Sequence, residues 1–247
     1  MLFQKLHLGN AQDTVDIRVT DGKFASIAPH LEPLRGEEVV ADCAGKMALP
    51  PFVESHVHLD TCLTAGRPRW NLSGTLFEGI QCWEEYKPSL THEDVKARVN
   101  QAIRMQAANG IQYVRTHVDI NDPKLTALEA MLEIRKEVRD YMDIQIVAFP
   151  QYGILSYPNG AKLLEQALEM GADAAGAIPH FEFTREYSVE SLNICMDLAA
   201  KYNKLVDVHC DEIDDEASRG LETLATRAYE MGMGEKVTAS HTTPTHS

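Results

Sequence analysis

The chain has 247 residues and a formal net charge of −14 at pH 7, from 37 acidic and 23 basic residues. A hydrophobic content of 44% excludes a disordered chain, and the length is enough to bury one good core. Because the negative charge would repel phosphate backbones and anionic lipid heads, we expect a small neutral or cationic substrate, with no nucleic-acid and no membrane partner.

Residues 1–49 alternate polar and apolar side chains, as in VDIRV and FASIA on either side of Asp21-Gly22. A period of two is typical of strands with one buried face, and an Asp-Gly pair is typical of a two-residue hairpin turn. We therefore expect residues 1–49 to form a small antiparallel β unit, one half of a sandwich.

From Pro50 onward, strand-like runs alternate with helix-like stretches. The runs lie at residues 53–59, 114–118, 144–149, 176–181, 205–210 and 236–241. Thr91, with Asp94 in the capping-box position, predicts one helix start, and Asp122-Pro123 predicts the next. This rhythm predicts an α/β fold, a (β/α)8 barrel of the TIM type over residues 50–247. Only about six of the eight βα units are counted, so we expect an incomplete barrel.

Six of the 10 histidines lie near the ends of predicted strands. His56 and His58 share one face of a strand, because side chains at i and i+2 point the same way. The other four are His117, His180, His209 and His241. Since the strand ends meet at one mouth of such a barrel, the pattern predicts a catalytic zinc or ferrous iron site. For His117 and His180, a hydrogen-bonding role in the core or behind the metal ligands is an equal alternative.

The stretch VHCDE indicates an acid-base group. Glu212 lies just beyond His209, and a carboxylate there can take a proton from an activated water and pass it to a substrate. Asp211 is the less favoured base, because it could instead hold a metal ligand in place. The alternative for Glu212 is an ordinary acidic loop residue, because Asp214 and Asp215 crowd the same stretch.

The cysteines and the apolar runs indicate a cytoplasmic protein. Five cysteines form an odd set without a CxxC pair, which argues against both a disulfide framework and a thiolate zinc site. The start MLFQKLHLGN lacks the apolar core of a signal peptide, and the apolar runs are too short to span a membrane.

Longer motifs resemble bacterial cytosine deaminase of the amidohydrolase superfamily. They are PPFVESHVHLDT, SGTLFEGI, NGIQYVRTHVD, IVAFPQYGILSYPNG, GAIPHFEFTREY, VHCDEIDDE and VTASHTT. The resemblance implies one divalent metal ion per chain, iron or zinc, bound by His56, His58 and His209. It also implies a proton shuttle at Glu212 and a residue at His241 that positions or polarises the attacking hydroxide.

For the substrate, the resemblance implies that Gln151 hydrogen-bonds the pyrimidine edge and that Phe149 and Leu76 lie beside the ring. The family is homo-oligomeric and has a further aspartate ligand on its eighth strand. That strand and the C-terminal sandwich strands are expected to be absent from this chain, which is therefore expected to be a C-terminally truncated form.

Three functions stay open at this point. The first is metal-dependent hydrolytic deamination of cytosine to uracil and ammonia, a step of pyrimidine salvage. The second is another amidohydrolase acting on a cyclic amide or amidine. A version of this second enzyme with two metal ions is less favoured. Relatives with two metal ions use a carboxylated lysine at the end of the fourth strand, and the corresponding stretch IPHFEF has no lysine. The third is a catalytically inactive fragment.

Overall fold

The structure is a computed structural model that describes residues 1–40 and 43–246. Contacts divide the chain into two compact units, Met1–Pro51 and Phe52–Ser247. Within the described residues, no helix has both the length and the apolar character needed to cross a membrane.

The N-terminal unit is a five-stranded sheet. Its strands are β1 Leu2–Leu8, β2 Thr14–Thr20, β3 Lys23–Ala28, β4 Val39–Val40 and β5 Met47–Ala48. Asp21 and Gly22, with φ of 51° and 71°, form the expected two-residue turn of an antiparallel β2–β3 hairpin. However, β4 and β5 both pair with β1 in parallel, so the expectation of an antiparallel unit is wrong for this edge. The chain after β3 crosses back before it rejoins β1, and it therefore enters the sheet in the same direction as β1.

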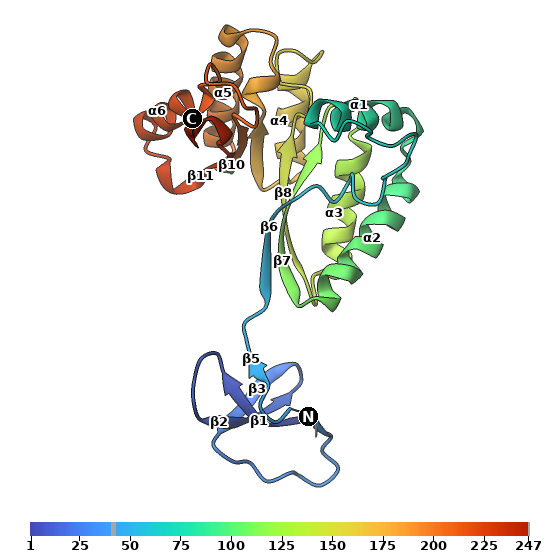
Figure 1. The fold of residues 1–247 in the computed structure, drawn as a ribbon, viewed down its shortest axis with the longest axis vertical. Helices are drawn as coiled ribbons and strands as arrows, with labels where there is room; N and C mark the ends of the chain where they lie inside the picture. The colour runs from blue at the N-terminus through green and yellow to red at the C-terminus, as the bar shows by residue number, and fades with distance from the viewer. Residues whose placement is uncertain (41–42, 247) are drawn as a thin grey trace. The chain divides into compact units, whose positions relative to one another are not determined.

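The larger unit contains a six-stranded parallel sheet in the order β11-β10-β9-β8-β7-β6 (Figure 1). The strands are β6 Phe52–Val57, β7 Ile111–Asp119, β8 Asp143–Phe149, β9 Ala174–Ala177, β10 Leu205–Cys210 and β11 Val237–His241. Neighbours in the sheet are neighbours in the chain, and every pair is parallel. The sheet curls into an incomplete TIM-type barrel, as the βα rhythm predicts.

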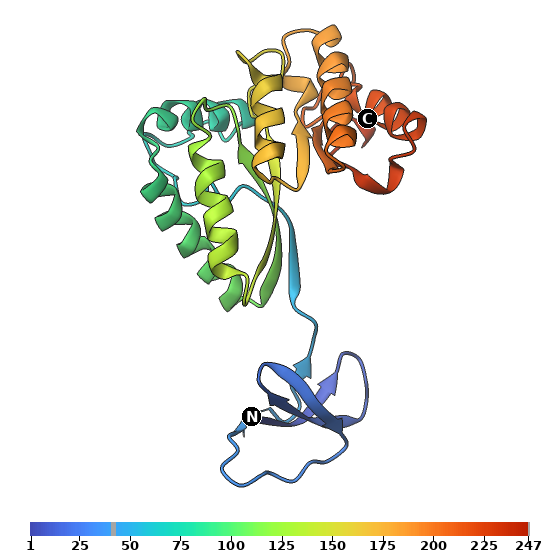
Figure 2. The ribbon, with the colours of Figure 1, turned by 180° about the vertical axis from the view of Figure 1, so that it is seen from behind.

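Helices follow the strands along the chain, and all of them except the first, Leu76–Tyr86, pack along one face of this sheet (Figure 2). They are α1 Leu76–Tyr86, α2 His92–Ala108, α3 Thr126–Val138, α4 Gly160–Met170, α5 Arg185–Lys201 and α6 Gly220–Glu230. The start of α2 is as expected, because the Thr91 hydroxyl accepts a hydrogen bond from the backbone N–H of Asp94 at 3.1 Å.

Several expected boundaries differ. The strand expected at 53–59 ends at Val57, so His58 lies just beyond it. The helix expected to open at Asp122-Pro123 begins only at Thr126, because Leu125 adopts a left-handed φ of 51° and the Asp122 carboxylate accepts the N–H of Thr126 instead. The strand expected at 176–181 ends at Ala177. His180 therefore lies on a short 3-10 helix, Pro179–Phe181, beyond the strand.

Alternation along each strand separates a helix-facing side from an inner side. In β10, Val206 and Val208 belong to the apolar core beneath the helices, whereas Asp207 and His209 do not. The strands thus bury aliphatic side chains on the outer face, while imidazoles and carboxylates line the inner face. This alternation places the imidazoles and carboxylates of the strands inside the curved sheet.

Candidate metal-dependent active site

Three histidines meet inside the curved sheet. His56 lies on β6 and His58 directly follows this strand, while His209 lies on β10. The Nε2 atoms of His58 and His209 are 3.0 Å apart, and each of the three rings offers a nitrogen within 4.8 Å of the others. Nitrogens that share one zinc or iron at about 2.0–2.1 Å would be about 3.0–3.4 Å apart, so the spacing suits a common metal ion.

The imidazoles are in the form that binds a cation. Burial, followed by the proximity of His117 and His241, lowers the pKa of His56 to about 4. Burial, followed by the neighbouring His117 and His56, lowers the pKa of His58 to about 3. Burial, followed by the neighbouring His58 and His117, also lowers the pKa of His209. All three rings are therefore neutral at pH 7, and their nitrogen lone pairs are available to a metal ion.

A second set of possible ligands fits a cation less well. His56, His117 and Asp207 also bring ligand atoms together, with His117 fully buried. However, the Asp207 carboxylate already accepts hydrogen bonds from Arg115 at 2.7 Å and from Ser240 at 3.0 Å. Since this guanidinium opposes a second positive charge, His56, His58 and His209 are the better metal set.

Asp207 was missed by the sequence analysis. Its carboxylate lies 3.3 Å from Nε2 of His117, on the inner face of the sheet. The signal was present, because Asp207 precedes His209 by two residues and therefore shares its strand face.

Glu212 and His241 lie next to the three histidines. The Glu212 carboxylate is 3.7 Å from Nε2 of His241, and both residues offer ligand atoms close to His209. Burial raises the pKa of Glu212 to about 7, which suits a group that must both accept and release a proton. The backbone N–H of Glu212 donates to Nδ1 of His180 at 3.3 Å, so His180 holds the backbone of Glu212 from behind.

These side chains open into one cavity of about 640 Å³. Gln151, two residues after β8, lines it together with the loop between β6 and α1, and Leu76 adds an apolar side chain. Phe149 is fully buried and stacks on the His209 ring with centroids 4.0 Å apart. The volume is large enough for a small ring-shaped ligand.

Residues 39–247 match the sequence pattern of the amidohydrolase family. The chain belongs to the amidohydrolase family. In structure it is similar to 5-methylcytosine deaminase from Klebsiella pneumoniae, with 49% identity over 99% of this chain and 59% of that one. The TM-score is 0.89 for that enzyme liganded with 5-fluorocytosine and 0.91 with phosphonocytosine.

Two further relatives act on another substrate. N-isopropylammelide isopropyl amidohydrolase from Pseudomonas sp. strain ADP is 32% identical over 98% of this chain and 60% of its own length. N-isopropylammelide isopropylaminohydrolase from Burkholderia multivorans is 28% identical, with a TM-score of 0.75 over 96% of this chain and 59% of that one. The chain thus spans about 60% of the length of these relatives.

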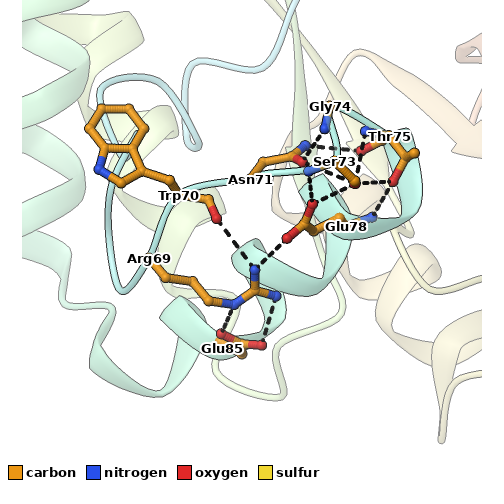
Figure 3. A network of polar contacts seen from close by, with 8 residues as sticks. All are labelled: Arg69, Trp70, Asn71, Ser73, Gly74, Thr75, Glu78 and Glu85. Carbon is orange, nitrogen blue, oxygen red and sulfur yellow. Dashed lines mark hydrogen bonds and ion pairs between the residues drawn. The ribbon is translucent and has the colours of Figure 1, made fainter.

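The loop between β6 and α1 forms one wall of the cavity and is tied to α1 (Figure 3). Arg69 donates to both oxygens of Glu85 at 2.9 and 3.1 Å and to Glu78 at 2.7 Å. The backbone N–H and hydroxyl of Ser73 also donate to Glu78, and the Thr75 hydroxyl accepts the N–H of Glu78 at the start of the helix. Hydrogen bonds from Ser73 and Arg69 lower the pKa of Glu78 to about 2, so this carboxylate stays charged and holds the wall in place.

The Asp211 carboxylate accepts hydrogen bonds at the start of α6. One of its oxygens accepts from the Ser218 hydroxyl at 2.6 Å and from the N–H of Gly220 at 2.9 Å, and the other accepts from the N–H of Leu221 at 2.9 Å. Burial by itself would raise the pKa of Asp211, but these hydrogen bonds lower it below its usual range. Asp211 therefore serves as a cap of the helix.

We expect Asp211→Asn to destabilise the amidohydrolase by about 1–3 kcal/mol, because one oxygen is replaced by an N–H donor that faces backbone donors. The free energy of unfolding from a denaturant titration measures the loss. Asp214→Asn, a substitution at an exposed position of the same loop, is the matched control and should stay within about 0.5 kcal/mol of the parent. Equal stability of the two variants would contradict the capping role.

Proposed function

We propose that this amidohydrolase removes the exocyclic amino group of cytosine or a close analogue such as 5-methylcytosine by hydrolysis, with one divalent metal ion. The observation that supports it best is the convergence of His209, Glu212, His241 and Gln151 on one cavity. The similarity to a deaminase crystallised with cytosine analogues adds the substrate class.

In this proposal His56, His58 and His209 hold the metal, iron or zinc. Their neutral nitrogens and the buried Nδ1 of His209, which has no hydrogen-bond partner within the described residues, are consistent with a site built around a cation. When bound, the metal supplies the Lewis acidity that makes water a nucleophile at neutral pH. The further aspartate ligand, the homo-oligomer and the cytoplasmic location stay predictions.

Glu212 moves the proton. Its carboxylate takes a proton from the attacking water and delivers it to the ring nitrogen next to the carbon that bears the amine. His241, with Nε2 3.7 Å from this carboxylate, orients the attacking oxygen. The hydroxyl oxygen adds to that carbon, and Glu212, deprotonated again, transfers the remaining hydroxyl proton to the amino group. The C–N bond then breaks, and uracil and ammonia leave when cytosine is the substrate.

Gln151 is the proposed specificity group. Its carboxamide can donate to and accept from the polar edge of a pyrimidine, whereas Leu76 offers an apolar contact to the ring. Phe149 stacks on the His209 ring and so helps to hold that imidazole in place. The position of Phe149 beside the substrate ring stays a prediction.

We expect Gln151→Ala to lower kcat/KM for cytosine about 10- to 100-fold, mainly through KM, because the polar edge of the bound base loses its partner. Gln112→Ala, at an exposed position on β7, is the matched control and should leave both constants unchanged. Ammonia release measures the rates. An unchanged KM in the Gln151 variant would contradict the proposed contact.

A substrate panel tests the function itself. Cytosine, 5-methylcytosine and N-isopropylammelide are offered to the metal-loaded protein, and ammonia and isopropylamine are measured separately. We expect ammonia from the two pyrimidines. Release of isopropylamine alone would contradict the proposal and would favour the activity named for the two relatives above.

A further inference from the structure

One short segment of the chain contacts two loops of the candidate site. Within it, His180 accepts the backbone N–H of Glu212. Two residues later, Glu182 contacts the loop after β8, which contains Gln151. A single segment after β9 therefore contacts both the loop of the proposed shuttle and the loop of the proposed specificity group.

The Glu182 carboxylate is surrounded by donors from the loop. One oxygen accepts the backbone N–H groups of Ile154 at 2.7 Å and Leu155 at 3.2 Å. The other accepts the N–H of Ser156 at 2.8 Å and its hydroxyl at 2.7 Å. Glu182 is only 9% exposed, so these bonds form away from water. Three successive N–H groups around one anion form a nest that fixes the backbone conformation of the loop.

The contact leaves no room for a side chain at position 153. Gly153 has a φ of +87°, and a Cβ added there would lie 2.7 Å from an oxygen of Glu182. In addition, the Asn121 side chain accepts the N–H of Tyr152 at 2.6 Å. The backbone after Gln151 is thus held by both Asn121 and Glu182.

We propose that Glu182 is a positioning residue for substrate recognition: it fixes the backbone of residues 153–156 and thereby places the Gln151 carboxamide in the cavity. This inference rests on the proposed role of Gln151. Glu182 is absent from the residues that line the cavity, so it acts through the loop and not on the substrate.

Glu182→Gln tests the proposal, because an amide of the same size places an N–H donor against other donors. Two readouts are combined. Hydrogen exchange measures the protection of the amides of residues 153–157, and steady-state kinetics gives KM and kcat for cytosine. Asp173→Asn is the matched control, because the Asp173 carboxylate also accepts a backbone N–H, that of Ile146, but away from this loop. Ser156→Ala, which removes only one of the four donors, is a milder variant in case Glu182→Gln folds poorly.

In Glu182→Gln, we expect exchange of the loop amides to become about tenfold faster and KM to rise about tenfold. Ser156→Ala should change both quantities in the same direction but less. Asp173→Asn should leave exchange of the loop amides unchanged. In a Gln151→Ala background, Glu182→Gln should raise KM less than about twofold further, because the group that it positions is gone. Unchanged loop protection, or a KM effect that adds in full to that of Gln151→Ala, would overturn the proposal. A parent protein that does not act on pyrimidines would overturn the proposed function instead, while loop protection would still decide whether Glu182 fixes the loop.

Discussion

Glu212→Gln should lower the turnover of cytosine by about two to four powers of ten, the usual contribution of general acid-base catalysis. The substitution keeps the size of the side chain but removes the group that accepts and releases the proton. Because Glu212 is outside the proposed metal set of three histidines, metal content should stay at the parent level. Turnover from ammonia release and metal content by elemental analysis measure the two effects on the same sample.

The control for this variant is Glu216→Gln, the same exchange at an exposed position of the same loop. It should retain parent turnover. If Glu212→Gln also turned over cytosine at nearly the parent rate, the proton would have to move through another group. Asp211 is a poor replacement, because both of its oxygens accept hydrogen bonds from the start of α6 and the residues before it.

His58→Ala should lower metal affinity more than about 100-fold, since even partners of metal ligands contribute about 10- to 100-fold. His58 provides one of the two nitrogens that lie 3.0 Å apart at the centre of the site. Zinc or iron content after dialysis against a weak chelator measures the loss, and turnover should fall with it.

His92→Ala is the matched control, because His92 lies at the first turn of α2 and faces Glu133 rather than the cavity. It should bind metal like the parent protein. Full metal content in His58→Ala would show that the assignment of the ligand set is wrong.

Local periodicity predicted the parts of this structure that depend on strand geometry. Alternation along a strand was enough to place His56 and His58 on one face, and the repeated strand-helix pattern predicted the parallel sheet. The start of α2 followed from Thr91, because a cap and its partner are separated by only three residues.

Contacts between distant residues could not be predicted in this way. Glu182 and the backbone N–H groups that it binds are 26 to 28 residues apart in the sequence, and Asp207 and Arg115 are 92 residues apart. No local pattern distinguishes the Glu182 carboxylate from a solvated one, and the strand position of Asp207 indicates its face but not its partner Arg115. The predicted start of α3 was wrong for a related reason. The left-handed conformation of Leu125 is set by its buried surroundings and not by its backbone propensity.

Sheet order and chain order coincide in the larger unit, and this has a consequence for how the protein is made. Each new strand from β7 to β11 finds its partner already synthesised, so the sheet can grow by one strand at a time as the chain leaves the ribosome. His56 lies on β6, the first strand of the sheet, and His58 directly follows it, whereas His209 follows His58 by 151 residues. The ring pair at the centre of the site therefore forms late, and with the proposed ligand set, tight metal uptake would require that the intervening strands have already assembled.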